Sequence, residues 1–226
     1  TYVTITPNDE IHDGSGGIAF TVVLNKGQTY SINGYDEFSD LSGTRVVSNK
    51  PIAITQNDDS ILIGDAYDIA GDQIVPVTNI GSEYIAVRGS LGAFGDVLAV
   101  TSVQDGTTIT FTSELSDEVI TLNRGESYSY NFLGATAYAE SDNPFYALHI
   151  TGQLTSSLDG EAGGALLPSL KCSPSQQISF SRSSNDSLYL LIVVRDGGEA
   201  GFTLNGSSTI IEASDFSYVN GTNNEW

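Results

Sequence analysis

Residues 95–152 read GDVLAVTSVQDGTTITFTSELSDEVITLNRGESYSYNFLGATAYAESDNPFYALHITG, and this stretch decides the fold. Apolar residues alternate with small or polar ones in residues 98–103, and residues 107–112 are rich in β-branched and aromatic side chains. Such residues suit a pleated, half-buried surface, and no window shows a helical period. Turn dipeptides such as Asp105-Gly106 and Arg124-Gly125 separate the runs. The stretch therefore predicts one all-β unit of short antiparallel strands.

Parts of this unit recur elsewhere in the chain. Residues 24–33 (LNKGQTYSIN) match residues 122–131 (LNRGESYSYN), and residues 48–52 (SNKPI) match residues 141–145 (SDNPF). A weaker third copy begins at Leu190, where LLIVVRDGGEAGFTLNG resembles VLAVTSVQDGTTITFTS. The copies lie a domain length apart, which is longer than one propeller blade or solenoid repeat. We expect tandem antiparallel β-sandwich-like modules, and a propeller-like ring is the alternative.

The repeats divide the chain into three expected modules. These are residues 1–88, residues 89–175 and residues 176–226, of which the first looks partial at its start and the third looks incomplete. The chain thus looks like a fragment of a larger protein. Outside the central stretch, the expected strands are residues 2–6, 18–24, 28–33, 44–47, 51–55, 73–77, 83–88, 177–182 and 187–195. Residues 57–72 and 154–174 are expected to be loops.

The composition is strongly acidic. The 226 residues contain 28 Asp and Glu against 8 Lys and Arg, for a formal net charge of −20. Such a charge repels phosphate backbones and anionic membrane surfaces, so we expect no nucleic acid as a partner. No apolar run approaches the length of a membrane span, so membrane insertion is not expected either. The single cysteine, Cys172, leaves no intrachain disulfide possible.

The most acidic segment is residues 57–72, NDDSILIGDAYDIAGD. Hard cations such as Ca²⁺ prefer six to eight oxygen ligands from carboxylates, amides and backbone carbonyls. The segment offers six such side chains but does not follow the EF-hand pattern. We therefore consider a calcium site against the alternative of solvated turn residues, with the candidate ligands Asn57, Asp58, Asp59, Asp65, Asp68 and Asp72.

No enzymatic motif stands out. Only His12 and His149 could act as histidine bases, and neither lies near a nucleophile-elbow or metal-binding spacing. Paired carboxylates of a glycosidase remain open, because acidic residues are abundant and no pair is distinguished. No phosphate-binding or dinucleotide fingerprint is present. We expect the chain not to be an enzyme.

Several motifs together resemble a known family. They are GTRVVSNKPIAI (43–54), GDQIVPVTNIGSEYIAV (71–87), GDVLAVTSVQDGTTIT (95–110), TLNRGESY (121–128) and GGALLPSLKCSPSQQISFSRS (163–183). In order and spacing they resemble the amino-terminal domain of the IgG-Fc-binding protein family, and still more its relatives in large secreted or surface proteins of Bacteroidetes-type bacteria. The resemblance implies an extracellular, non-enzymatic, adhesion- or matrix-like module. No residue set for immunoglobulin binding can be transferred.

One departure from the family concerns its cysteines. Relatives often carry a cysteine just before the segment that matches residues 68–72, where this chain has Tyr67. Cys172 is therefore left without the partner that a family disulfide would need.

Short modification motifs add a further expectation. Ser60 and Ser187 lie in the Asp-Ser-apolar pattern that Bacteroidetes-type bacteria O-glycosylate on exported proteins. Asn185, Asn205 and Asn220 begin N-glycosylation sequons, which have meaning only in a eukaryotic secretory pathway. Given the bacterial resemblance, Ser60 and Ser187 are the preferred glycosylation sites.

Three functions remain open. The first is a surface or extracellular structural or adhesive module that presents acidic loops to a glycan or protein partner. The second is a carbohydrate-active module, either a binding domain or a hydrolase, for which the loop aromatics Tyr35, Phe38, Tyr67, Phe94 and Trp226 could form a platform. The third is a self-assembling filament subunit, in which a strand of one copy completes the next.

Overall fold

The protein is built from antiparallel β-strands. The computed structural model describes residues 1–63, 66–89, 95–151, 163–172, 175–179, 190–208 and 210–226, and within β4 and β5 it leaves out the side chains of residues 59, 60 and 62–68. The described residues contain no α-helix, and their only helical turns are three short 3-10 segments. The all-β expectation is confirmed.

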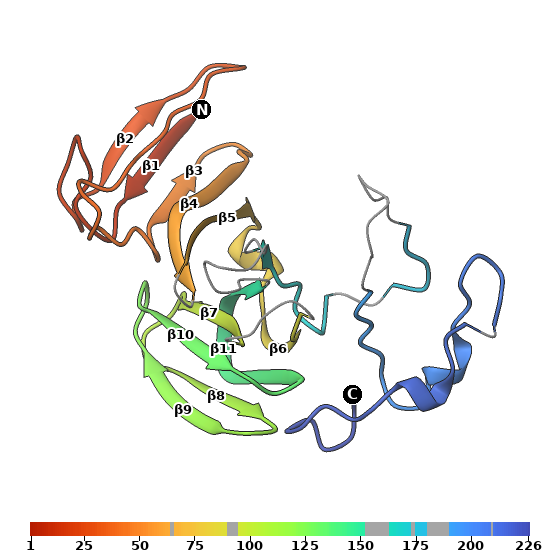
Figure 1. Ribbon diagram of the computed structural model, residues 1–226. Helices are drawn as coiled ribbons and strands as arrows, with labels where there is room; N and C mark the ends of the chain where they lie inside the picture. Colours follow the sequence, from red (N-terminus) through yellow and green to blue (C-terminus); the bar gives the residue numbers. More distant parts are fainter. Residues whose placement is uncertain (64–65, 90–94, 152–162, 173–174, 180–189, 209) are drawn as a thin grey trace.

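Three strands form an N-terminal sheet (Figure 1). Its strand β1 (Tyr2–Thr6) lies between β2 (Phe20–Val23) and β3 (Arg45–Ser48) and is antiparallel to both. Alternate residues of β1 face opposite sides, so Val3 and Ile5 are buried while Tyr2 is exposed. One face of this small sheet therefore remains open to solvent.

A separate two-stranded hairpin follows. It consists of β4 (Ile54–Ile63) and β5 (Ala66–Ile74), whose register shifts between Asp58 and Ile61. The acidic segment 57–72 lies within this hairpin, so its prediction as a loop is wrong. Asp, Asn and Gly are abundant in this segment and favour turns over strands, so the pairing was not evident from the sequence.

Seven strands form the central sheet. Five follow the order β10-β7-β11-β8-β9, while β6 and β12 pair additionally with β11. Their bounds are β6 (Gly81–Val87), β7 (Asp96–Ser102), β8 (Thr107–Ser113), β9 (Asp117–Leu122), β10 (Ser127–Phe132), β11 (Thr136–Thr151) and β12 (Gly163–Leu166). The 3-10 turn η1 (Val77–Asn79) precedes β6.

The long strand β11 makes the sheet curl. Its first part pairs with β6 and β8, and its second part pairs with β7 and β12. The register shifts between Glu140 and Phe145, where the Ser141 hydroxyl donates to the carbonyl of Asn143 ahead of Pro144. Irregularities of this kind bend a strand and increase its twist. The result is a half-barrel whose two halves face each other across one core.

Apolar side chains from both halves fill this core. Leu98 and Val100 of β7 lie fully buried with Ile109 and Phe111 of β8 and with Phe145 of β11. Phe111 stacks on Tyr130 of β10 with ring centroids 4.5 Å apart. Strands β10 and β9 lie at the two ends of the strand order. The Tyr130 hydroxyl of β10 contacts Ser116 beside β9 and so links these two ends.

The C-terminal residues 190–226 contain two 3-10 turns, η2 (Glu199–Gly201) and η3 (Ala213–Asp215), and no strand among those described. Val219 and Trp226 pack against Ile85 and Tyr138 on the outer face of the central sheet. Residues 28–33 were predicted as a strand, as were residues 187–195, of which the structure describes 190–195; neither described segment pairs in a sheet.

The arrangement of sheets differs in detail from the expectation. Neither tandem sandwich-like modules nor a propeller-like ring is seen in the described residues; instead a small sheet, a hairpin and a curled sheet follow one another. Strand β6, from the end of the expected first module, pairs with β11 of the second. The division into modules at residues 88 and 175 stays a prediction.

Candidate functional site

The proposed calcium ligands lie along the β4–β5 hairpin. Asn57 and Asp58 are neighbours on β4, so their side chains point to opposite faces, while Asp72 lies opposite Gln56 on β5. Only Asp58 and Asp72 of these three share a face. Asp65 and the side chains of Asp59 and Asp68 lie outside the described residues.

The Asp72 carboxylate accepts hydrogen bonds that link the hairpin to the central sheet. One carboxylate oxygen accepts a hydrogen bond of 2.8 Å from the backbone N–H of Leu166 in β12, and the other accepts one of 2.6 Å from the N–H of Gln73. The residue thereby ties the hairpin to the central sheet. Among the described residues, no three of the His, Cys, Asp and Glu side chains gather as metal ligands would. Calcium binding at this hairpin stays a prediction.

A buried polar pair lies at one end of the core. The Asp96 carboxylate, with only 1% of the residue exposed, is 2.8 Å from Nε2 of His149 and accepts a 2.8 Å hydrogen bond from the N–H of Gly89. The pair thus joins the start of β7, the end of β6 and the second part of β11. The second carboxylate oxygen of Asp96, Oδ1, and the hydroxyl of Thr151 have no hydrogen-bond partner among the residues that the structure describes.

The pair explains why a histidine lies in an apolar strand. Its aromatic neighbour Phe132, at 5.9 Å between ring centroids, and the buried carboxylate hold the imidazole in the sheet. The sequence showed His149 but not its partner; the one available signal was an Asp directly before the apolar run of β7. The contacts of Asp96 tie three strands together, and among the described residues no hydroxyl or thiol is bonded to the imidazole.

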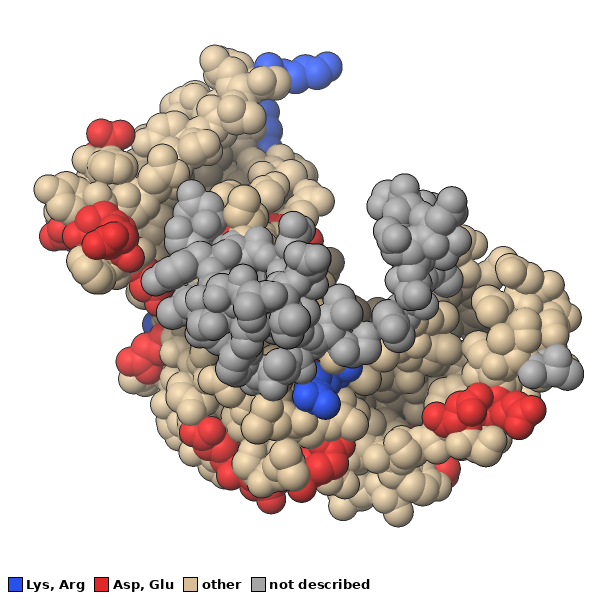
Figure 2. Space-filling model, in the orientation of Figure 1, with Lys and Arg blue, Asp and Glu red and all other residues tan. Residues whose placement is uncertain are grey.

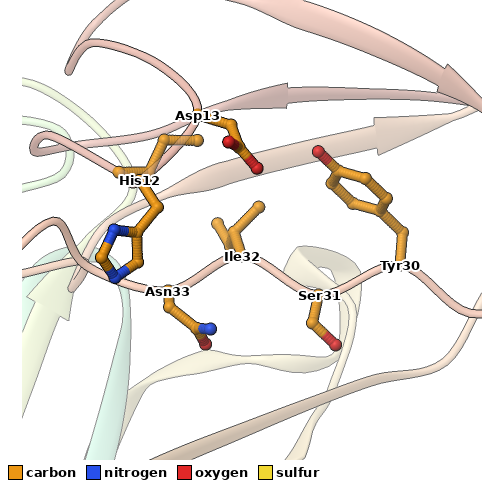
Figure 3. A pocket seen from close by; sticks show the side chains of 7 residues that line it. His12, Asp13, Tyr30, Ser31, Ile32 and Asn33 are labelled. Carbon is orange, nitrogen blue, oxygen red and sulfur yellow. The ribbon is translucent and has the colours of Figure 1, made fainter.

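The second histidine lines a small cavity in the N-terminal unit (Figure 3). Ile11, His12 and Asp13 contribute from one side and residues 30–33 from the other; the Asp13 carboxylate points toward the Tyr30 hydroxyl, while the imidazole turns toward Asn33. The cavity measures about 60 Å³. Ligand sites enclose roughly 300–1,000 Å³, and one water occupies about 30 Å³, so this cavity holds little more than water.

A larger recess lies beside the loop that follows β12. It measures about 430 Å³ and is lined by Val75, Thr78, Asn79, Leu166, Leu167, Pro168 and Cys172. Its size would suit a small ligand, and none of these seven described lining residues is charged. Cys172 is exposed and free, as its status as the only cysteine requires.

Two of the five loop aromatics are available to a partner. Tyr35 is 56% exposed and Phe38 is 83% exposed, and the Asp36 carboxylate fixes their loop by accepting from the N–H of Phe38. Trp226 is half-buried beneath Arg195, whose guanidinium carbon lies 5.2 Å from the ring centre. The side chain of Tyr67 and all of Phe94 lie outside the described residues.

The glycosylation candidates are mostly outside the described side chains. This holds for the side chain of Ser60, which is part of β4, and for Ser187 and Asn185 entirely. Asn205 occupies an exposed turn at a positive φ of 51°. In the Asn220 sequon the Thr222 hydroxyl is buried and donates to the carbonyl of Val219.

Among the charged side chains on the face shown in Figure 2, Asp and Glu cover more surface than Lys and Arg. Only two ion pairs between Lys or Arg and a carboxylate occur in the described chain, Lys171 with Glu83 and Arg195 with Glu225. No helix in the described part of the chain is long and apolar enough to cross a membrane. These features define a mostly β module with a large, acidic, exposed surface.

Comparison with known families agrees with this picture. A family model described as IgGFc binding protein matches residues 1–226, the whole chain, so the chain belongs to that family. Proteins of this family are typically secreted. Neither a search of curated proteins nor one of solved structures finds a match.

Proposed function

We propose that the chain is a structural or adhesive module of an exported protein and binds a glycan or protein partner through its exposed loops. The observation that carries the proposal is the loop of residues 34–42. It holds the exposed rings of Tyr35 and Phe38 among three exposed carboxylates, Asp36, Glu37 and Asp40. None of these carboxylates forms an ion pair in the described chain, so their charge is available to a partner.

The loop is also held in one conformation, which lowers the entropy lost on binding. The Asp36 carboxylate accepts from the N–H of Phe38 and from the Ser39 hydroxyl, and the Asp40 N–H donates to Asp9. Exposed aromatic rings on a rigid support are typical anchors of protein interfaces. A partner with basic side chains would complement both the rings and the carboxylates.

Binding to arrays of glycans and of basic proteins tests the proposal. We expect Phe38→Ala and Tyr35→Ala to weaken binding about tenfold each, the size typical of an interface anchor. Tyr218→Ala is the matched control, because Tyr218 is also 56% exposed but lies in the C-terminal segment. Equal affinity of all three variants and the unchanged chain would rule out this loop as the binding surface.

A carbohydrate-active module is the second candidate, and the exposure of Tyr35 and Phe38 is what favours it. Sugars stack on such rings without needing charge, whereas a basic protein is attracted by the carboxylates. Raising the salt concentration should therefore leave glycan binding unchanged but weaken protein binding. A hydrolase screen on common polysaccharides separates a catalytic module from a binding one.

A further inference from the structure

The cavity shown in Figure 3 lies directly beside the loop of residues 34–42. The N–H of Tyr35 donates to the carbonyl of Glu10, and the N–H of His12 donates to the carbonyl of Asn33. The two segments that line the cavity are thus joined by their backbones. The rings of His12 and Tyr35 lie 6.0 Å apart between centroids. The cavity and the exposed aromatic side chains of the loop therefore belong to one surface.

Both walls of the cavity are held in place by contacts within the N-terminal unit. Ile11 is 3% exposed, exchanges two backbone hydrogen bonds with Gly14 and forms a β-bridge with Gly34. On the other wall, the ring of Tyr30 meets that of Phe20 in β2 edge-on, with centroids 6.1 Å apart. A ligand would therefore enter a site that is already formed, which lowers the entropy lost on binding.

Two polar groups face each other across this cavity. The carboxylate of Asp13 points toward the hydroxyl of Tyr30 (Figure 3). With the residues that the structure describes, neither group forms a side-chain hydrogen bond or an ion pair. Asp13 is exposed and Tyr30 is 45% exposed, so both can be reached from solvent. The cavity thus offers a carboxylate and a hydroxyl oxygen to the same ligand.

The charge of the cavity favours a cationic ligand. An ionised carboxylate can only accept hydrogen bonds, and it accepts the strongest ones from positively charged donors. None of the seven described lining residues is Lys or Arg, so no positive side chain of the lining neutralises Asp13. The formal net charge of −20 also attracts a cation toward the surface.

The size of the cavity favours an ammonium group over a guanidinium group. Its volume of about 60 Å³ is roughly twice the volume that one water molecule occupies in the liquid. The ammonium of lysine is compact and carries its charge on one atom, whereas the guanidinium of arginine is a wider planar fork. A lysine also has a flexible methylene stem that can lie along aromatic rings while its charged end reaches a polar partner.

We propose that the cavity receives a lysine side chain of the partner, with the ammonium group held between the carboxylate of Asp13 and the hydroxyl of Tyr30. The methylene stem of that lysine passes over the rings of His12 and Tyr35. The inference rests on the proposed function, because it names the chemistry of the partner that the loop of residues 34–42 binds.

The first test uses the n-butylammonium ion, which has the stem and charged end of lysine. We expect the amide resonances of residues 11–13 and 30–35 to shift in a saturable manner in nuclear magnetic resonance spectra at constant ionic strength. n-Butanol, which has a similar stem without the charge, should produce no such shifts. The absence of saturable shifts with n-butylammonium, or equal shifts with n-butanol, would overturn the proposal.

A second probe tests the choice of lysine over arginine. We expect the n-propylguanidinium ion to bind this cavity more weakly than n-butylammonium, because its planar fork is wider than the cavity accommodates. Equal or tighter binding of n-propylguanidinium would overturn the assignment to an ammonium group.

Two variants test the roles of the facing groups. Asp13→Asn keeps the shape of the side chain and removes its charge, so we expect about a tenfold loss of affinity for n-butylammonium. Tyr30→Phe removes one neutral acceptor and should cost about threefold. Asp117→Asn, at an exposed position on β9, removes the same charge far from the cavity lining and is the control. If Asp13→Asn lowers the affinity no more than Asp117→Asn, the carboxylate does not hold the cation and the proposal fails.

The same variants separate this inference from the proposed function on the protein array. We expect Asp13→Asn to weaken binding to lysine-rich proteins about tenfold. Full binding by Asp13→Asn together with weakened binding by Phe38→Ala would overturn the lysine site and leave the proposed loop as the binding surface. Weakened binding by Asp13→Asn together with full binding by Tyr35→Ala and Phe38→Ala would support the lysine site and rule out the aromatic anchors.

Discussion

Gly43 and Gly27 differ in how much space the neighbouring backbone leaves for a side chain. Gly43 has a φ of 80°, and a Cβ there would overlap the carbonyl oxygen of Gly125. Gly27 has nearly the same φ of 79° but nothing within 4 Å. A side chain at either position meets the strain of left-handed backbone, but only at Gly43 does it also collide with the neighbouring turn.

The pair gives a matched stability experiment. We expect Gly27→Ala to lower the free energy of unfolding by about 1–2 kcal/mol, the cost of an alanine in left-handed backbone. Gly43→Ala should cost about 1–3 kcal/mol more, because the overlap forces the two turns apart. Urea unfolding of both variants measures the difference, and equal losses would show that the Gly43–Gly125 contact adds nothing.

Asp96 carries the second prediction at this scale. Asp96→Ala leaves the Gly89 N–H and the imidazole of His149 without their buried acceptor, so we expect a loss of about 2–4 kcal/mol. Asp105→Ala is the control: Asp105 accepts from the N–H of Arg124 at an exposed site and should cost less than about 1 kcal/mol. Thermal and urea unfolding measure the stability of both variants. A similar loss of unfolding free energy in the two would show that the buried Asp96–His149 pair does not stabilise the fold more than an exposed hydrogen bond.

The tyrosines give the pH dependence. Burial raises the pKa of Tyr84, Tyr138 and Tyr146 above the ordinary 10.0, and for Tyr138 the charges of Glu140 and Glu83 add to the effect. The hydrogen bond to Glu118 raises the pKa of Tyr128. A raised pKa in the folded state means that stability is fully present below pH 10 and is lost as the pH rises above it.

Phenolate absorbance checks this expectation. In the native protein part of the tyrosine absorbance should appear only well above pH 10, and in urea all of it should appear near pH 10. Tyr138→Phe should reduce the part of the tyrosine absorbance that appears only well above pH 10. It should also make the free energy of unfolding fall less steeply as the pH rises above 10. Identical native and denatured titrations would contradict the prediction.

At the scale of elements, the curl of the central sheet depends on contacts between strands that share no backbone hydrogen bonds. Strands β9 and β10 are consecutive in sequence, yet β9 pairs with β8 and β10 pairs with β7. No ladder joins the two strands: the Tyr130 hydroxyl contacts Ser113 of β8 and Ser116 in the turn before β9, and the Tyr128 hydroxyl donates to Glu118 of β9. These contacts close the half-barrel at its open side.

Removing one hydroxyl tests that closure. We expect Tyr130→Phe to lower the free energy of unfolding by about 1–2 kcal/mol, because the buried hydroxyl of Tyr130 and its hydrogen bonds to the Ser113 hydroxyl and the Ser116 carbonyl are lost. Tyr128→Phe should cost less than about 1 kcal/mol, because Glu118 remains accessible to water. Urea unfolding of both variants measures the two losses of stability. A larger loss for Tyr128→Phe than for Tyr130→Phe would contradict the prediction.

Much of the element structure could be predicted from the sequence. The sequence placed β1 correctly, and the strands it predicts at residues 107–112, 119–122 and 127–131 lie within one or two residues of the bounds of β8, β9 and β10. It failed at β11, where residues 141–144 have the composition of a turn but form a bend inside one continuous strand. Local composition cannot distinguish the two, because the pairing with four other strands is what keeps the chain extended.

The missed features of the sites have similar causes. The segment 57–72 contains so many carboxylates that it resembled a loop, whereas pairing with its own second half makes it a hairpin. The partnership of Asp96 and His149 depends on strands that lie far apart in sequence. The exposure of Tyr35 and Phe38, by contrast, followed from their position among Gly, Asp and Ser residues.

At the scale of the whole molecule, the described C-terminal residues pack on the central sheet through a small hydrophobic cluster. Val219 and Trp226 contact Ile85 and Tyr138, while Arg195 covers the indole and pairs with Glu225. Trp226 is the only tryptophan, so its fluorescence reports this attachment alone.

The attachment gives a prediction about cooperativity. If the cluster folds together with the sheet, fluorescence and far-ultraviolet circular dichroism should show the same urea midpoint. Val219→Asp should expose Trp226 to water and shift its emission to longer wavelength, while the circular dichroism of the sheet persists. Arg195→Ala, at an exposed ion pair, should change the midpoint little. Separate midpoints in the unchanged chain would mean that the segment detaches first.

Strand β11 finally determines the order in which the molecule can be made. During synthesis the ribosome releases β6 to β10 first, and these strands pair among themselves only as β7 with β10 and β8 with β9. The strand that joins them to one another and to β6 emerges last of the six. Until β11 is synthesised, the nascent chain therefore carries two strand pairs that no third strand joins, and Leu98, Val100, Ile109 and Phe111 lack their packing against β11. Apolar surface exposed in this way is what chaperones bind.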